Sequence, residues 1–169
     1  MKKLQKKIQS VLHWKTVGIF LLFLNMSVNV FSETITLNPT ADTDSQSDVA
    51  AGTNPTLNAS QWCHLFIRFD LSSVSGTVSS AKLRIYQPNG QSAYTMNVST
   101  TSTDTWSEGG TKPSQGSLVT SKSLSGAAGY VEIDITSHVQ TKLAGNKVVS
   151  LTLTTNLGTW TSFNSRQAS

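Results

Sequence analysis

Cysteine is almost absent from this chain of 169 residues, in which Cys63 is the only one. An internal disulfide is therefore excluded, and so are metal sites that use paired cysteines. In an oxidising compartment a lone cysteine is typically a small, buried apolar residue rather than a reactive thiol. We expect Cys63 to lie buried on a strand.

Long hydrophobic runs are also lacking, because the apolar stretch Val17 to Leu24 falls well short of the roughly 18 to 20 residues that a bilayer requires. Lysines precede this stretch, and small or modest residues lie around Ser32. This pattern is typical of an export signal. We therefore expect residues 1–32 to be a signal peptide, the protein to be secreted, and no membrane contact after cleavage.

Little net charge remains once the predicted signal peptide is removed. Residues 1–32 hold five of the 13 Lys and Arg residues and none of the 9 Asp and Glu residues. The other 137 residues thus carry eight basic and nine acidic side chains, a net charge of −1. A nucleic-acid partner, which requires a basic surface, is not expected. The remaining length is enough for one domain with one core.

Signatures of catalysis are missing as well. The chain has no G-x-S-x-G, H-E-x-x-H, C-x-x-C or glycine-rich phosphate loop. His64 adjoins Cys63, but neighbouring residues on a strand point to opposite faces. Glu132 and Asp134 would share one face of a strand at roughly 6 to 7 Å, near the spacing used in glycoside hydrolysis. We favour a solvated polar face for this pair and predict that the protein is not an enzyme.

The chain is instead rich in segments where apolar and polar residues alternate with a period of two, as in half-buried strands. These segments begin at Ile35 and Leu37 and recur at residues 65–71, 81–86, 94–99, 131–135 and 149–154. We expect the second and third segments, joined by a polar link, to form two antiparallel strands. The whole pattern predicts an all-β fold, a two-sheet antiparallel β-sandwich, as a single domain over residues 33–169.

One short helix is expected near residues 137–144. Ser137 and Gln140 have the spacing of a capping box, and Gly145 supplies a stop.

Two segments carry a family resemblance. Residues 69–86 read FDLSSVSGTVSSAKLRIY, and residues 131–145 read VEIDITSHVQTKLAG. They resemble the core motifs of DNRLRE-type modules, a secreted bacterial family grouped with carbohydrate-binding modules. Residues 104–108 and 163–167 resemble two further elements of that family, "D-x-W-S-E" and "F-x-S-R-E". The resemblance spans about Ala41 to Arg166, and it implies a jelly-roll-like, non-catalytic module that commonly lies beside a polysaccharide lyase or hydrolase.

The sequence departs from this family in two places. Glu108 leads through two glycines to Pro113, which shortens a loop of the family, and the family's final strand has no counterpart before Ser169. A missing strand would expose a sheet edge. We therefore expect the chain to be a fragment or to be completed by another chain; a monodisperse, cooperatively melting monomer of residues 33–169 would contradict this.

Glycan binding requires flat aromatic faces for sugar rings. The available platforms are Trp62, Trp106, Trp160 and Tyr94. We favour Trp62 and Trp160, because their surroundings are typical of loops, and we expect Trp106 to be wedged into the core edge.

Cations would bind the carboxylates or hydroxyls of a glycan. Arg68, Lys82 and Arg84 fall on the polar faces of strands on either side of the polar link. If those strands pair as a hairpin, the three cations lie together and would hold an acidic polysaccharide such as alginate or pectin. An exposed face balanced by carboxylates is the alternative interpretation, and both stay open.

No cofactor is predicted. Asp42, Asp44 and Asp48 offer oxygens for a structural calcium ion, but Gln46 and Ser47 stand where an EF-hand loop would have Asp or Asn and Gly. We favour an exposed, turn-forming loop for this segment.

The predicted function is non-catalytic binding of a polysaccharide by a secreted module, with an adjacent catalytic domain in an intact gene product. The alternative is a structural or adhesive extracellular β-sandwich that binds no glycan.

Overall fold

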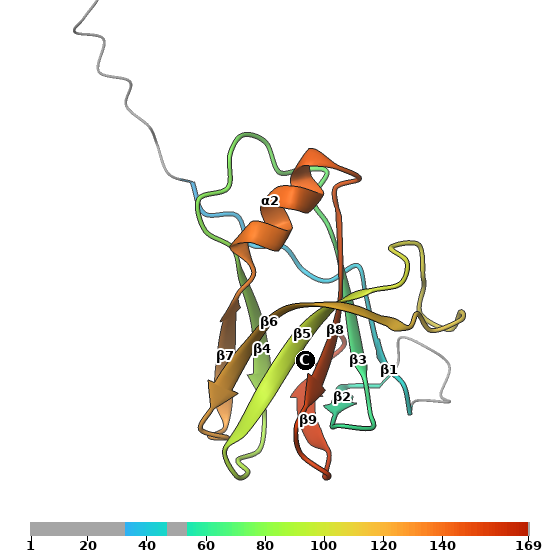
Figure 1. Ribbon diagram of the computed structural model, residues 1–169, viewed down its shortest axis with the longest axis vertical. Helices are drawn as coiled ribbons and strands as arrows, with labels where there is room; N and C mark the ends of the chain where they lie inside the picture. Colours follow the sequence, from blue (N-terminus) through green and yellow to red (C-terminus); the bar gives the residue numbers. More distant parts are fainter. Residues whose placement is uncertain (1–32, 47–53, 169) are drawn as a thin grey trace, which may run out of the picture. The chain divides into compact units, whose positions relative to one another are not determined.

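The computed structural model describes residues 33–46 and 54–168 and confirms a mostly antiparallel β fold with one short helix (Figure 1). The predicted signal peptide lies outside the described residues. In chain order the elements are β1 (Ala41–Asp44), β2 (Thr56–Ala59), β3 (Leu65–Asp70), β4 (Lys82–Gln87), β5 (Tyr94–Thr101), β6 (Gln115–Leu124), β7 (Gly129–Asp134), α2 (Thr136–Ala144), β8 (Val148–Thr155) and β9 (Thr161–Asn164).

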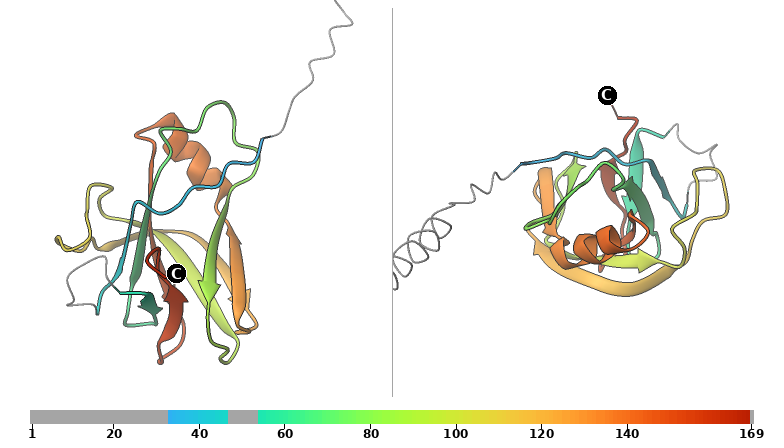
Figure 2. Two further views of the ribbon diagram at one scale, coloured as in Figure 1. Left: turned by 180° about the vertical axis from the view of Figure 1, so that it is seen from behind. Right: turned by 90° about the horizontal axis from the view of Figure 1, so that it is seen from above.

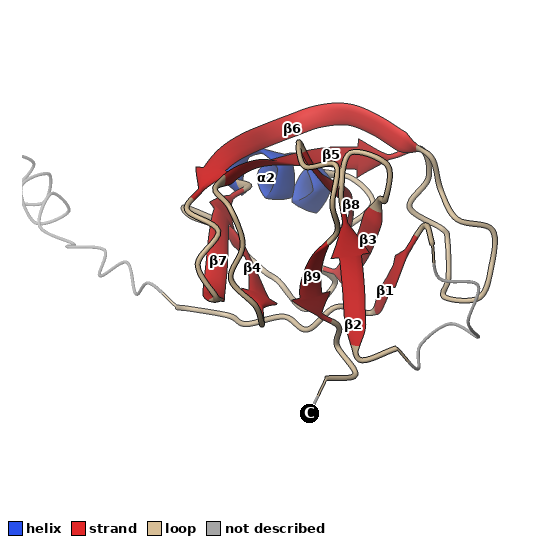
Figure 3. Cartoon of the chain, turned by 90° about the horizontal axis from the view of Figure 1, so that it is seen from below, coloured by secondary structure: helices blue, strands red, loops and turns tan. Residues whose placement is uncertain are grey.

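The strands form two layers (Figure 2). One layer is a five-stranded sheet in the order β1-β3-β8-β5-β6, and the other consists of two ribbons, β2-β9 and β4-β7. Strand β4 lies beside β9, so the ribbons are neighbours within their layer. Strand β6 curves around the edge of the sandwich toward β7 (Figure 3).

The core lies between the layers and follows the predicted alternation. Leu83 and Val131 are 2% and 7% exposed, whereas the neighbouring Arg84 and Glu132 face solvent. Each fully buried aliphatic side chain contributes roughly 1.5 to 3 kcal/mol relative to an exposed one. The inward rows of the five-stranded sheet and of the ribbons are Leu65, Ile67, Met96, Val98, Leu151, Leu153, Leu83, Ile85, Val131, Ile133 and Phe163.

The predicted hairpin of β3 and β4 was wrong. Strand β3 pairs with β1 and β8, whereas β4 pairs with β7, in the other layer. A tight hairpin needs a connection of two to five residues. The link from Leu71 to Ala81 is longer, and it crosses between layers that lie roughly 10 Å apart in such packings.

The N-terminal part also differs from the prediction. Residues 35–40, which the structure describes, form no strand and cross the outside of the ribbon layer, with Leu37 partly buried against the core (Figure 2). The first strand is β1, within the segment expected to be an exposed loop, and it buries Asp42 and Asp44. Asp44 is tolerated there because its carboxylate accepts hydrogen bonds from the backbone N–H groups of Gln46 and Asn58.

Two local predictions were right in part. Cys63 is fully buried, but it lies in the loop before β3, where its thiol donates to the carbonyl of Asn58. Helix α2 ends at Gly145 as expected, but Ser137 is not its cap. The side chain of Asp134, at the end of β7, accepts from the N–H of Thr136 instead.

A second, smaller apolar cluster lies outside the five-stranded sheet. Trp106 packs edge-on against Phe66, with ring centroids 6.2 Å apart, and its indole N–H donates to Ser150 Oγ at 2.5 Å. The expectation that Trp106 belongs to the core edge is confirmed. Glu108 lies on the same loop as Trp106, and Arg166 donates two hydrogen bonds of 2.8 Å to its carboxylate.

The ion pair of Arg166 with Glu108 predicts that the effect of Glu108→Gln on stability depends on pH. The Arg166 guanidinium lowers the pKa of Glu108 below its ordinary value of 4.5, so its stabilising contribution is present above that value and is lost as the pH falls through the lower, folded-state pKa. Burial raises the pKa of Asp42, and the Glu108 carboxylate raises it further, so Glu108→Gln also relieves an unfavourable effect on Asp42, which makes the loss near pH 7 smaller. The melting temperature of the variant should be lower than that of the parent near pH 7, and the difference should be smaller near pH 3. An equal difference in melting temperature at both pH values would contradict a stabilising role of this ion pair.

Candidate functional site

The outer face of the β4-β7 ribbon brings exposed charged and aromatic side chains together. Because the inward positions of both strands are buried, the alternate positions face solvent. Three cross-strand pairs result, namely Lys82 with Asp134, Arg84 with Glu132, and Tyr86 with Tyr130. We call these six residues the β4-β7 outer face.

An aromatic platform forms one end of this face. The rings of Tyr86 and Tyr130 meet edge to face, with centroids 5.0 Å apart, and Tyr130 is 62% exposed. The guanidinium of Arg84 lies over the Tyr130 ring, 3.7 Å from its centroid, in a cation–π contact. The contact restricts the arginine and covers one face of the Tyr130 ring, so its positive charge lies beside the aromatic surface that Tyr86 and the rest of Tyr130 expose.

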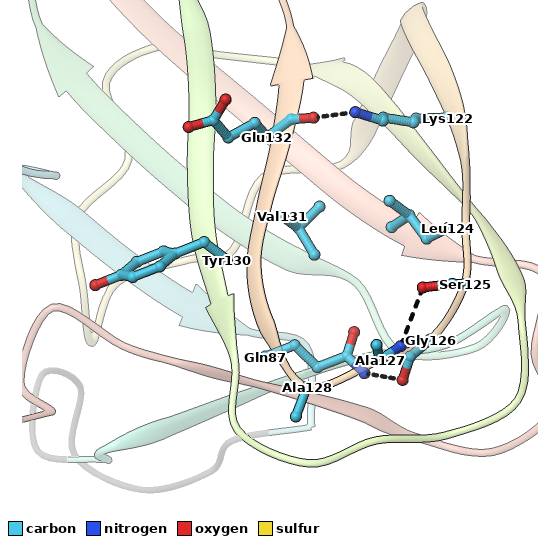
Figure 4. Close-up of a pocket in the computed structure, with 10 residues that line it drawn as sticks. All are labelled: Gln87, Lys122, Leu124, Ser125, Gly126, Ala127, Ala128, Tyr130, Val131 and Glu132. Carbon is cyan, nitrogen blue, oxygen red and sulfur yellow. Dashed lines mark hydrogen bonds between the residues drawn. The ribbon is translucent and has the colours of Figure 1, made fainter.

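Charged groups occupy the rest of the face. Glu132 is approached by Lys82 Nζ, 3.1 Å from Oε2, and by Arg84 Nε, 3.7 Å from Oε1. The ammonium of Lys122, on β6, donates to the backbone carbonyl of Glu132 at 2.6 Å (Figure 4). The hydrogen bond from Lys82 lowers the pKa of Glu132, and that from the Thr136 N–H lowers the pKa of Asp134.

Both carboxylates are therefore ionised at neutral pH. The three cations around them, Lys82, Arg84 and Lys122, exceed them by one positive charge. Glycoside hydrolysis needs one carboxylic acid whose pKa is raised. The lowered pKa values of Glu132 and Asp134, both exposed, fit the favoured interpretation of a solvated polar face.

A shallow hollow between β6 and β7 adjoins this face (Figure 4). Gln87 lines this hollow. Its side-chain amide donates to the carbonyl of Gly126 and accepts from the hydroxyl of Tyr94. Gly126 has a φ of +77°, and a Cβ there would lie 2.3 Å from the carbonyl oxygen of Gln91. Burial raises the pKa of Tyr94 to about 12. Tyr94 is thus a structural residue, and the idea that it offers a sugar platform was wrong.

Two tryptophans lie on neighbouring loops at the end of the sandwich opposite α2. Trp62 and Trp160 are 72% and 60% exposed, and the backbone N–H of Gln61 donates to the carbonyl of Leu157, which joins their loops. The side chain of Gln91, which follows β4, donates to Thr161 at the start of β9. Trp160 therefore lies close to the end of β4 that carries the aromatic platform.

The sequence identifies the class of module. The model of carbohydrate-binding module family 96 matches residues 33–169. The chain belongs to this family. No curated protein matches the chain at a significant level. Family membership places the function of this family-96 module in carbohydrate binding, with a carbohydrate as its partner.

Of the five predicted site residues of this family-96 module, Arg68 lies apart from Lys82 and Arg84. It is on β3, in the other layer, where its guanidinium donates to the backbone carbonyl of Trp106 and lies 5.6 Å from the centroid of that indole ring. The predicted cluster of three cations depended on the hairpin, which does not exist. Arg68 instead holds the Trp106 loop, whereas Lys82 and Arg84 lie together as predicted.

Tyr86, Tyr130 and Lys122 are additions that the sequence analysis missed. The alternation of apolar and polar residues places both tyrosines on the solvent-facing side of their strands, but their contact depends on the pairing of β4 with β7. Lys122 comes from β6, a strand absent from the predicted set.

The described residues offer no group of three or more His, Cys, Asp and Glu side chains that would hold a metal ion. Asp48, one of the three proposed calcium ligands, lies outside the described residues. Within residues 33–46 and 54–168, no helix is long and apolar enough to cross a membrane.

Proposed function

We propose that this family-96 module binds an acidic polysaccharide, a uronate polymer such as alginate or pectin, on the β4-β7 outer face and without catalysis. The observation that carries the proposal is the stacking of Arg84 on Tyr130 beside Lys82. An aromatic face accepts the apolar side of a sugar ring, and adjacent cations pair with its carboxylate. Trp160, which is exposed near the end of β4, offers a second aromatic face to the polymer.

The module is proposed to act outside the cell, after removal of residues 1–32 as a signal peptide, beside a catalytic domain. The resemblance of residues 69–86 and 131–145 to the motifs of DNRLRE-type modules supports this setting. A structural or adhesive role is the competing proposal, and it requires no glycan.

Retention on immobilised polymers tests the proposal. The protein is expected to be retained by alginate or pectin more strongly than by xylan or cellulose, and less strongly as salt rises, because exposed charges are screened over roughly 10 Å at 0.1 M salt. Arg84→Ala should weaken binding by about tenfold, which corresponds to about 1.4 kcal/mol.

Arg68→Ala is the matched control, since it removes an arginine from the opposite layer. It should leave retention unchanged at temperatures where the variant is folded. Equal losses in both arginine variants would refute the assigned surface. Retention on none of the four polymers would favour the adhesive role, and release of unsaturated uronates would indicate a lyase.

A further inference from the structure

The carboxylate of Glu132 lies at the centre of the cations that the proposed site offers to a ligand. It contacts Lys82 Nζ at 3.1 Å and Arg84 Nε at 3.7 Å, and its side chain is 44% exposed. The positions that a uronate carboxylate would take beside these cations are thus partly filled by the protein's own carboxylate.

We infer that Glu132 is an internal competitor for ligand. Its carboxylate occupies the cationic subsite formed by Lys82 and Arg84, and it must leave that subsite when a ligand carboxylate binds. The inference rests on the proposed function, because it concerns the same surface. It assigns to Glu132 the role of setting how strongly the module prefers charged glycans over neutral ones.

The surroundings of Glu132 make such displacement feasible. Exposed ion pairs are worth only about 0 to 1 kcal/mol, so exchanging one carboxylate for another costs little. The Glu132 side chain lies on the same, exposed side of β7 as Tyr130, whereas Val131 points to the opposite side (Figure 4). A movement of Glu132 therefore leaves the core row undisturbed.

Lys122 and Asp134 behave differently from Glu132. Lys122 is bonded to the backbone carbonyl of Glu132, so it stays in place when the carboxylate moves. Asp134 accepts from the N–H of Thr136 at 2.8 Å, which ties its carboxylate to the start of α2. Asp134 interacts with the charge of Lys82, its cross-strand partner, but only Glu132 forms ion pairs with both Lys82 and Arg84.

Glu132→Gln tests the inference, because it removes the charge and keeps nearly the same shape. The Kd for an alginate or oligogalacturonate oligosaccharide is expected to fall by roughly three- to tenfold in low salt, since a repelling charge is lost beside the ligand carboxylate. The gain should nearly vanish in about 1 M salt, where the Debye length is about 3 Å. The Kd for a neutral xylo-oligosaccharide should stay unchanged.

Asp134→Asn is the matched control, since it removes the same charge from the same face and retains an acceptor for Thr136. Its effect on the uronate Kd is expected to be below about twofold. If the parent binds uronates and Glu132→Gln binds them equally or less well, Glu132 orients the cations and the inference fails while the proposed function stands. An equal gain in both variants would mean a general charge effect and would also refute it. If neither parent nor variant binds any uronate, the proposed function itself fails.

Discussion

Leu83→Asp is expected to unfold the sandwich, whereas Arg84→Ala on the next residue is expected to leave it folded. Leu83 is 2% exposed and packs in the core row opposite Ile133, so the variant would bury a carboxylate without a partner. Burying an unpaired charge costs several kcal/mol, which is comparable to the whole stability of a domain, about 5 to 15 kcal/mol. Arg84 faces solvent, and its loss removes exposed contacts worth about 1 kcal/mol or less.

Far-ultraviolet circular dichroism during thermal denaturation distinguishes the two variants. The aspartate variant should show no cooperative transition, and the alanine variant should melt within a few degrees of the parent protein. Similar melting of both variants would mean that the inner and outer faces of β4 are assigned wrongly.

Trp106→Ala is expected to be the second most damaging change, with a loss of about 3 to 5 kcal/mol of unfolding free energy. The indole covers Phe66, bonds to Ser150 and lies against Arg68, so its removal opens a cavity and leaves a buried hydroxyl without its donor. Trp160→Ala removes the same side chain from an exposed site and should change stability by about 0.5 kcal/mol or less.

Chemical denaturation of both tryptophan variants checks this prediction, and binding assays supply the reciprocal test. Trp160→Ala should weaken retention on uronate polymers, whereas folded Trp106→Ala should not. A stable Trp106→Ala protein would show that the small cluster outside the five-stranded sheet contributes nothing to folding.

The period-two pattern predicted β3, β4, β5, β7 and β8 and their core-facing rows, because alternation reports directly which side of a strand meets the core. It did not reveal β2, β6 or β9. Strand β6 is mostly exposed, and so it lacks the apolar row that the pattern detects. Strand β1 was missed for another reason, since Asp42 and Asp44 are buried through hydrogen bonds to the backbone.

Pairing was harder to predict than strand position. Strands β4 and β7 are separated by more than 40 residues, and no local turn signal links them. The meeting of Arg84 with Tyr130 follows from that pairing alone. The sequence therefore predicted Lys82 and Arg84 as site residues but placed Arg68 with them, because a hairpin was the simplest connection of adjacent strands.

Amide chemical-shift changes during titration with an alginate oligosaccharide test the central proposal most directly. The proposal predicts that the largest changes fall on Arg84, Tyr86 and Tyr130, with a smaller response at Trp160, and that they diminish in high salt. Changes centred on Arg68 and Trp106, or no change at any concentration of uronate, would contradict it.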